Sequence, residues 1–183
     1  MSADPTKLLK AQRLAPSYQP DQDRIRIDLD DDQGQCLSLW LTRRLAVRLL
    51  PVLASKLKST HGVAAKLPES LRANVLAMEH VAVTNRARSD VKSASPLKVV
   101  GEPLLLQTIE LRQRGDALML YFCGLNSSEL ASLHANRAVL HQFAGALVRN
   151  MRRACWLETV SLDWLDESVD TADQQAPAGA LLN

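Results

Sequence analysis

The stretch Cys36–Lys58, CLSLWLTRRLAVRLLPVLASKLK, decides the predicted fold because its periodicity changes within a few residues. Cys36–Leu41 alternates in the manner of a strand, and Thr42 is a good helix N-cap. After Thr42, apolar side chains recur every three or four positions, which predicts an amphipathic helix over 43–58. Pro51 lies in its middle and predicts a kink or a division into two helices. The predicted buried stripe is Leu45, Leu49, Leu53 and Leu57, broadened by Leu50 and Val52. A later predicted helix, over 137–153, has the corresponding stripe Leu140, Phe143, Leu147 and Met151.

A weaker copy of this strand–helix junction follows 94 residues later, where Ser132 aligns with Ser38 and Arg137 with Arg43. Each copy is preceded by a second alternating stretch and a turn, which is typical of a hairpin. These stretches are Arg24–Leu29 and Thr108–Leu111. The pattern predicts an α+β fold of two related ββα halves, with a mainly antiparallel sheet and helices packed on one face. Because few aligned positions are identical, chance similarity of two amphipathic junctions stays open as the alternative.

The predicted domain organisation is one α+β domain with an extension at each end. Prolines and polar residues predict a flexible N-terminal arm at 1–22. An acidic segment followed by Ala and Pro predicts a disordered tail at 167–183. The single domain at 23–166 divides into a first ββα half at 23–60, a connecting helix and linker at 61–100, and a second ββ(β)α half at 101–157.

The connecting segment predicts a helix from Glu69 to about Arg86, followed by a surface linker over Asn85–Lys98. Its apolar residues recur at helical spacing and lie on one face of the predicted helix. They are Leu71, Val75, Met78 and Ala82. Further along, Val160–Leu165 alternates and predicts a final strand or a docking segment.

Composition places the chain among ordinary globular proteins. Its 183 residues are enough for one domain with a core, and 46% of them are hydrophobic. No apolar run is long enough to span a bilayer, and the N-terminus lacks a signal-peptide core. The three cysteines are widely spaced and odd in number, which favours reduced thiols in a cytoplasmic protein.

No pattern in the sequence predicts a catalytic, cofactor-binding or metal-binding residue. The acidic run from Asp28 to Gly34 lacks the glycine and glutamate positions of a calcium loop, so we expect a soluble hairpin turn. His134 and His141 lie close to one another in the predicted fold, but ordinary structural histidines are favoured over a shared metal. We therefore predict no enzyme, no cofactor and no small-molecule ligand.

Both predicted helices that follow the copied strands, 43–58 and 137–153, are basic, while acidic residues gather at 21–32 and 158–173. Cations on a helix suit phosphate binding, although they more often only solvate an exposed face. The candidate phosphate- or partner-contacting patch is Arg43, Arg44, Arg48, Arg149, Arg152 and Arg153.

The sequence therefore favours a non-catalytic cytosolic protein-interaction or assembly module that self-associates as a homodimer or binds a protein partner. An exposed strand edge is the expected place for pairing. The alternative is a nucleic-acid-binding regulator that uses the two basic helices. No membrane partner is predicted.

Overall fold

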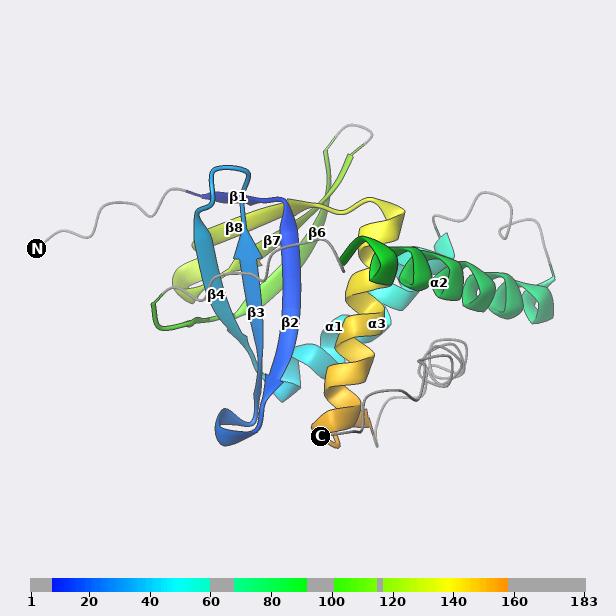
Figure 1. The fold of residues 1–183 in the computed structure, drawn as a ribbon, viewed down its shortest axis with the longest axis horizontal. Helices are drawn as coiled ribbons and strands as arrows, with labels where there is room; N and C mark the ends of the chain where they lie inside the picture. The colour runs from blue at the N-terminus through cyan, green and yellow to red at the C-terminus, as the bar shows by residue number, and fades with distance from the viewer. Residues whose placement is uncertain (1–7, 60–67, 92–100, 115–116, 158–183) are drawn as a thin grey trace, which may run out of the picture.

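The computed structural model describes residues 8–59, 68–91, 101–114 and 117–157 (Figure 1). Within them the fold is mixed α+β, as predicted, with two four-stranded sheets and three α-helices. The elements are β1 Leu9–Ala11, β2 Arg13–Gln19, η1 Pro20–Gln22, β3 Arg24–Asp30, β4 Cys36–Leu41, α1 Arg43–Ser59, α2 Glu69–Val91, β5 Leu104–Leu105, β6 Thr108–Arg114, β7 Ala117–Cys123, η3 Leu125–Ser127, β8 Glu129–His134 and α3 Arg137–Arg153.

The two sheets have the strand orders β1-β8-β7-β6 and β2-β3-β4-β5. Within each sheet, three long strands that follow one another in the chain pair antiparallel. A short fourth strand then pairs in parallel: β1 with β8 in one sheet, and β5 with β4 in the other. Each sheet therefore takes its parallel strand from a distant part of the chain.

Two bent segments of the chain join the sheets. Gln12 alone separates β1 from β2, and its N–H donates to the Asp30 carbonyl at 2.7 Å. Between β5 and β6, Leu106 N–H donates to the Trp40 carbonyl at 3.0 Å and Gln107 N–H to the Cys123 carbonyl at 2.9 Å. Because each bent segment belongs to both sheets, the strands pair with one another in a closed ring. The two sheets cross one another in Figure 1.

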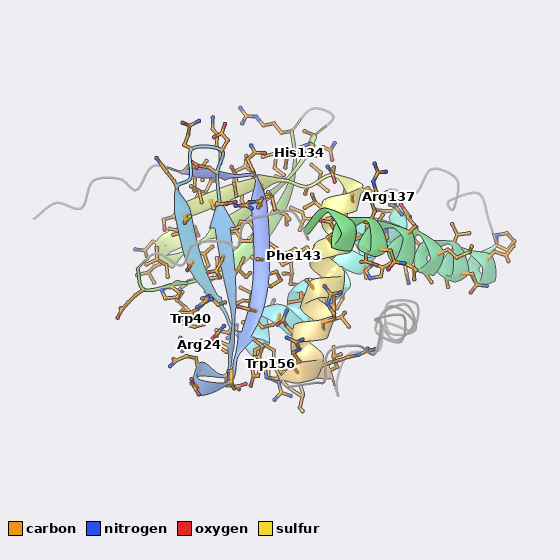
Figure 2. The ribbon with its side chains drawn as sticks, in the orientation of Figure 1. Arg24, Trp40, His134, Arg137, Phe143 and Trp156 are labelled. Atoms are coloured by element: carbon orange, nitrogen blue, oxygen red, sulfur yellow. The ribbon has the colours of Figure 1, made fainter. Side chains whose placement is uncertain are left out.

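The core lies between the sheets and helices α1 and α3, which pack against each other. Alternation on β3 buries Ile25 and Ile27 completely, as predicted for a strand with one wet face. Phe143 of α3 and Trp156 beyond its end lie beside the β2–β3–β4 sheet (Figure 2). The predicted helix faces are confirmed at their centres, where Leu49, Leu53, Leu57, Leu140, Phe143, Leu147 and Met151 are all buried.

The interpretation of residues 1–22 as a loose arm does not hold for residues 9–22. Leu9 and Ala11 are buried in β1, and β2 pairs with β3 over its whole length. β1 has only three residues, and β2, although seven residues long, contains Pro16 and does not alternate between apolar and polar residues.

Two helix predictions also need correction. Of the two alternatives predicted for Pro51, division of the helix is wrong, because α1 is one continuous helix with Pro51 on its exposed side. Helix α2 continues to Val91, so the predicted linker over Asn85–Lys98 begins inside a helix. The rest of that linker, the predicted strand or docking segment Val160–Leu165 and the predicted tail 167–183 lie outside the described residues.

Candidate interaction surfaces

Helix α2 presents most of its predicted apolar face to solvent. Met78 is 74% exposed and Leu71 is 48% exposed, Ala82 is also exposed, and Val75 is half-buried. The helix projects away from the two sheets (Figure 1). The apolar face that the sequence predicts for α2 is therefore largely left on the surface. We call Leu71, Val75, Met78 and Ala82 the α2 stripe.

The opposite face of α2 packs on α3, although it is more polar. Leu76, His80 and Thr84 lie four residues apart and are all buried. The Thr84 hydroxyl donates to the carbonyl of His80 at 2.7 Å, which satisfies it within the helix. Leu76 and two buried polar side chains therefore attach α2 to the domain, while most of the α2 stripe remains outside.

A buried histidine pair holds the contact between α2 and α3. The Nδ1 atoms of His80 and His141 are 3.3 Å apart, and the two residues are only 1% and 0% exposed. At this distance one ring donates and the other accepts, so at least one nitrogen must be deprotonated. Burial, reinforced by the neighbouring His141 and Arg149, lowers the pKa of His80 to about 4.

Glu79 joins this pair to a wider polar network. Its carboxylate accepts from Arg137 Nε at 2.5 Å and from the second Arg137 nitrogen at 2.6 Å, and lies 3.3 Å from His141 Nε2. Arg137 also donates to the carbonyl of Leu57 at 2.8 Å, which ties α1 to the same network. Because both rings are closed off from solvent, the arrangement suits helix docking rather than catalysis on a substrate.

The outer edge of β2 is covered by the side chain of Asn150, which bonds to the strand backbone as a neighbouring strand would. The amide oxygen of Asn150 on α3 accepts from the N–H of Tyr18 at 2.7 Å, and its nitrogen donates to the carbonyl of Pro16 at 3.1 Å. Asn150 is itself buried. Helix α3 thus closes this edge against pairing with another chain.

We expect Asn150→Ala to lower the free energy of unfolding by about 1–3 kcal/mol, because it leaves two partly buried backbone groups without their partner. Urea unfolding followed by circular dichroism measures the change. The control is Gln142→Ala, which makes the same kind of truncation at an exposed residue of the same helix. Equal stability of the two variants would contradict the edge-covering role.

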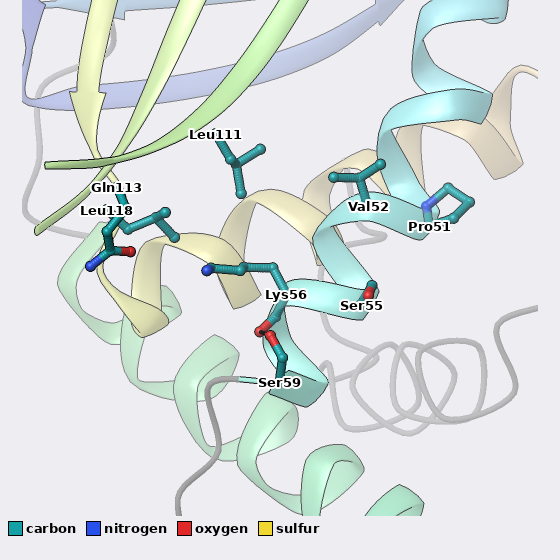
Figure 3. A pocket seen from close by; sticks show the side chains of 8 residues that line it. All are labelled: Pro51, Val52, Ser55, Lys56, Ser59, Leu111, Gln113 and Leu118. Atoms are coloured by element: carbon teal, nitrogen blue, oxygen red, sulfur yellow. Dashed lines mark hydrogen bonds between the residues drawn. The ribbon is translucent and has the colours of Figure 1, made fainter.

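A groove lies between α1 and one face of the β6–β7 pair. The groove has a volume of about 480 Å³ and separates the later turns of α1 from β6 and the start of β7 (Figure 3). Its apolar lining includes Val52, which is 51% exposed, and the half-buried Leu111. The full lining is Pro51, Val52, Ser55, Lys56, Ser59, Leu111, Gln113 and Leu118.

The predicted basic patch is only partly assembled. Arg43, Arg44 and Arg48 are exposed near the start of α1, whereas Arg149 is half-buried beside Gly145 and the His80 ring. The start of α1 follows Leu41, whose partner on β3 is Ile25. The end of α3 leads to Trp156, whose indole N–H donates to Asp23 at 3.2 Å. Because Asp23 and Ile25 are close in the chain, the arginines at the start of α1 and those at the end of α3 lie at the same end of the domain. At the end of α3, Arg152 is half-buried and Arg153 is exposed.

The acidic hairpin residues have structural partners. Asp28 accepts from the hydroxyl of Ser38 at 2.6 Å and from Arg26 at 3.1 Å, and Asp30 pairs with Arg13. Asp31 accepts from two backbone N–H groups of its own turn. The expectation that these acids only solubilise the turn is therefore too simple, because Asp28 and Asp30 are buried.

His134 and His141 are not neighbours in a shared site, because His134 is exposed at the end of β8 and His141 is buried against His80. In the described part of the chain, no group of three or more histidines, cysteines or carboxylates is arranged to hold a metal ion. None of the described helices combines the length and apolar character needed to cross a membrane. Cys36, Cys123 and Cys155 are all free thiols.

Comparisons with known proteins returned no matching family model, no matching curated protein and no matching solved structure.

Proposed function

We propose that this protein is a non-catalytic, cytosolic assembly module that self-associates through the α2 stripe. The observation that carries the proposal is the 74% exposure of Met78 on a face that is apolar at Leu71, Val75 and Ala82 as well. An exposed apolar face of this kind is a liability in a monomer and is expected where another chain covers it. The free thiols are consistent with a reducing compartment.

The spacing of the α2 stripe favours a second copy of the same helix as its partner. The steps from Leu71 to Val75, Met78 and Ala82 are four, three and four residues, which is the spacing of the inner positions of a coiled coil. A surface with this spacing is complementary to itself across a twofold axis. Helix α2 projects from the sheets, so its outer turns do not pack against them (Figure 1).

We also propose that the two halves of the chain descend from a duplicated ββα unit. The bounds of α1, 43–59, shifted by 94 residues, give 137–153, which are the bounds of α3. The same shift superimposes β3 on β7 and β4 on β8 to within one residue. The two parallel pairings support the same proposal, since each half contributes its first short strand to the sheet of the other.

Met78→Glu tests the proposed dimer. A twofold axis places both copies of the substituted residue in the interface, so we expect Kd to rise about a hundredfold or more, which corresponds to about 2.8 kcal/mol. Light scattering across a concentration series, at low and high salt, measures the mass. Ala73→Glu introduces the same charge at an exposed position of α2 outside the stripe and should leave the dimer intact. A wild-type protein that is monomeric at every concentration would refute the proposal.

Nucleic-acid binding is the second candidate, because the exposed Arg43, Arg44 and Arg48 lie together on α1 at the end of the domain that also carries Arg153. Phosphate contacts of this kind weaken steeply with salt. Co-purifying nucleic acid, released by salt and lost in a triple Arg43→Ala, Arg44→Ala, Arg48→Ala variant, would favour this function over the assembly module.

A further inference from the structure

Trp40 lies on the outer face of the sheet β2-β3-β4-β5, near the end of β4. Its neighbours Leu39 and Leu41 are completely buried, so the alternation of the strand turns Trp40 away from the core. The register sets Trp40, which is half-buried, between Arg26 on β3 and Leu105 on β5. Leu105 is 47% exposed. An aromatic and an aliphatic side chain are therefore neighbours on the outer face of this sheet.

Arginines without a partner lie next to Trp40. Arg24 precedes Arg26 by two residues on the same face of β3, and the pairing of Ile25 with Leu41 sets it beside the start of α1. Arg24 and Trp40 lie near one another toward the lower end of the sheet in Figure 2. Among the described residues, no hydrogen bond or ion pair engages the side chains of Arg24, Arg43, Arg44 and Arg48. Arg24 is half-buried, and the three arginines of α1 are exposed.

The carboxylates nearby do not cancel this charge. Asp28 and Asp30, which are buried on the same face of β3, are each paired with an arginine of their own sheet. The turn that leads into β3 adds Asp21 and Asp23, so the four arginines outnumber the two carboxylates at this end of the domain. The surface beside Trp40 therefore has a net positive charge, which attracts phosphates.

We infer that this face binds single-stranded nucleic acid, with a base against Trp40 and Leu105 and the phosphates on the arginines. Stacking on an aromatic side chain needs a base that is free of a duplex, whereas arginines alone accept the phosphates of a duplex as well. The presence of Trp40 among the cations therefore favours the single strand. Because Trp40 is half-buried within a strand, it does not project as an anchor into a lipid surface. The inference rests on nucleic-acid binding, the second candidate function, and adds the sheet face and the single-stranded form.

Fluorescence anisotropy with a labelled oligothymidylate tests the inference on the full-length protein. We expect binding that weakens steeply as salt increases, and about tenfold weaker binding of a duplex of the same length. Trp40→Ala should raise Kd about tenfold, whereas Trp40→Phe, which keeps an aromatic ring, should raise it by about threefold at most. Binding should also quench the tryptophan emission of the wild type, and Trp40→Phe should lose most of that quenching.

Arg24→Ala tests the phosphate contacts and does not depend on whether Trp40→Ala folds. It should weaken binding and lower the slope of log Kd against log salt by about 0.7, the value for one contact with a single strand. The matched control is Arg114→Ala, which removes an exposed arginine from β6 in the other sheet and should leave both Kd and the slope unchanged.

Equal affinity for the duplex and the single strand would overturn this inference and leave nucleic-acid binding in place, whereas binding of neither would overturn both. Full quenching with Trp40→Phe, or equal effects of Arg24→Ala and Arg114→Ala, would show that the strand binds elsewhere. Binding to phosphatidylserine vesicles in place of oligothymidylate would also overturn the inference and would assign the face to anionic lipid.

Discussion

Phe143→Asp is expected to unfold the domain. Phe143 is 1% exposed on α3 and belongs to the core that both sheets and α1 share. Truncation of a buried phenylalanine alone costs about 3–5 kcal/mol, and a buried, unpaired carboxylate adds several more. Because a domain of this size is stable by about 5–15 kcal/mol, the sum removes most or all of its stability.

The matched control is Gln142→Asp, which puts the same carboxylate one residue away on the exposed face of α3. We expect a cooperative thermal transition close to that of the wild type for Gln142→Asp and none for Phe143→Asp. The signal to follow is far-ultraviolet circular dichroism during heating. A normal melt for Phe143→Asp would show that the helix facing described above is wrong.

The facing of α1 and α3 was predictable from sequence because burial and periodicity agree there. Each helix follows a strand directly, and its apolar residues recur on one stripe that meets the sheets, as at Leu49 and Leu147. Thr42 and Asn136 supply the expected caps: the side chain of Asn136 accepts from the N–H of Val139 at 2.9 Å. Local sequence therefore contains the signals for these two units.

The facing of α2 could not be predicted in the same way, because periodicity reports an apolar face but not what covers it. The residues at Leu71 and Met78 fit a core as well as they fit a surface that another chain covers. On the buried face, His80 and Thr84 lie four residues apart, which is the spacing of a packed stripe, but both side chains are polar. His80 meets His141 across 61 residues, a contact that no local pattern contains.

The edge-covering role of Asn150 was missed for a related reason. Its partners, the backbone groups of Pro16 and Tyr18, belong to a strand that is 134 and 132 residues away in the chain. A single asparagine within a basic helix gives no local sign of such a role. Sequence thus predicts which segments form, whereas the polar contacts between them depend on the assembled fold.

Acid is expected to weaken the attachment of α2 to α3 through His80. The ring is buried against His141 and Arg149, with Glu79 the acidic neighbour in the same network. The pKa of His80 falls from the ordinary 6.5 to about 4, because burial disfavours the charged ring and the neighbouring His141 and Arg149 act in the same direction. The unfolded chain therefore binds a proton on His80 at a higher pH than the folded chain does.

It follows that the stabilisation from neutral His80 is complete above pH 6.5 and is lost as the pH falls towards 4, by about 3 kcal/mol in total. Urea unfolding at intervals between pH 7 and pH 4 measures the slope. His80→Asn keeps a polar partner for His141 but does not titrate, so its stability should fall less steeply over this window. His134→Asn, at an exposed histidine, should keep the wild-type slope. Identical slopes for His80→Asn and the wild type would remove His80 as the source of acid sensitivity.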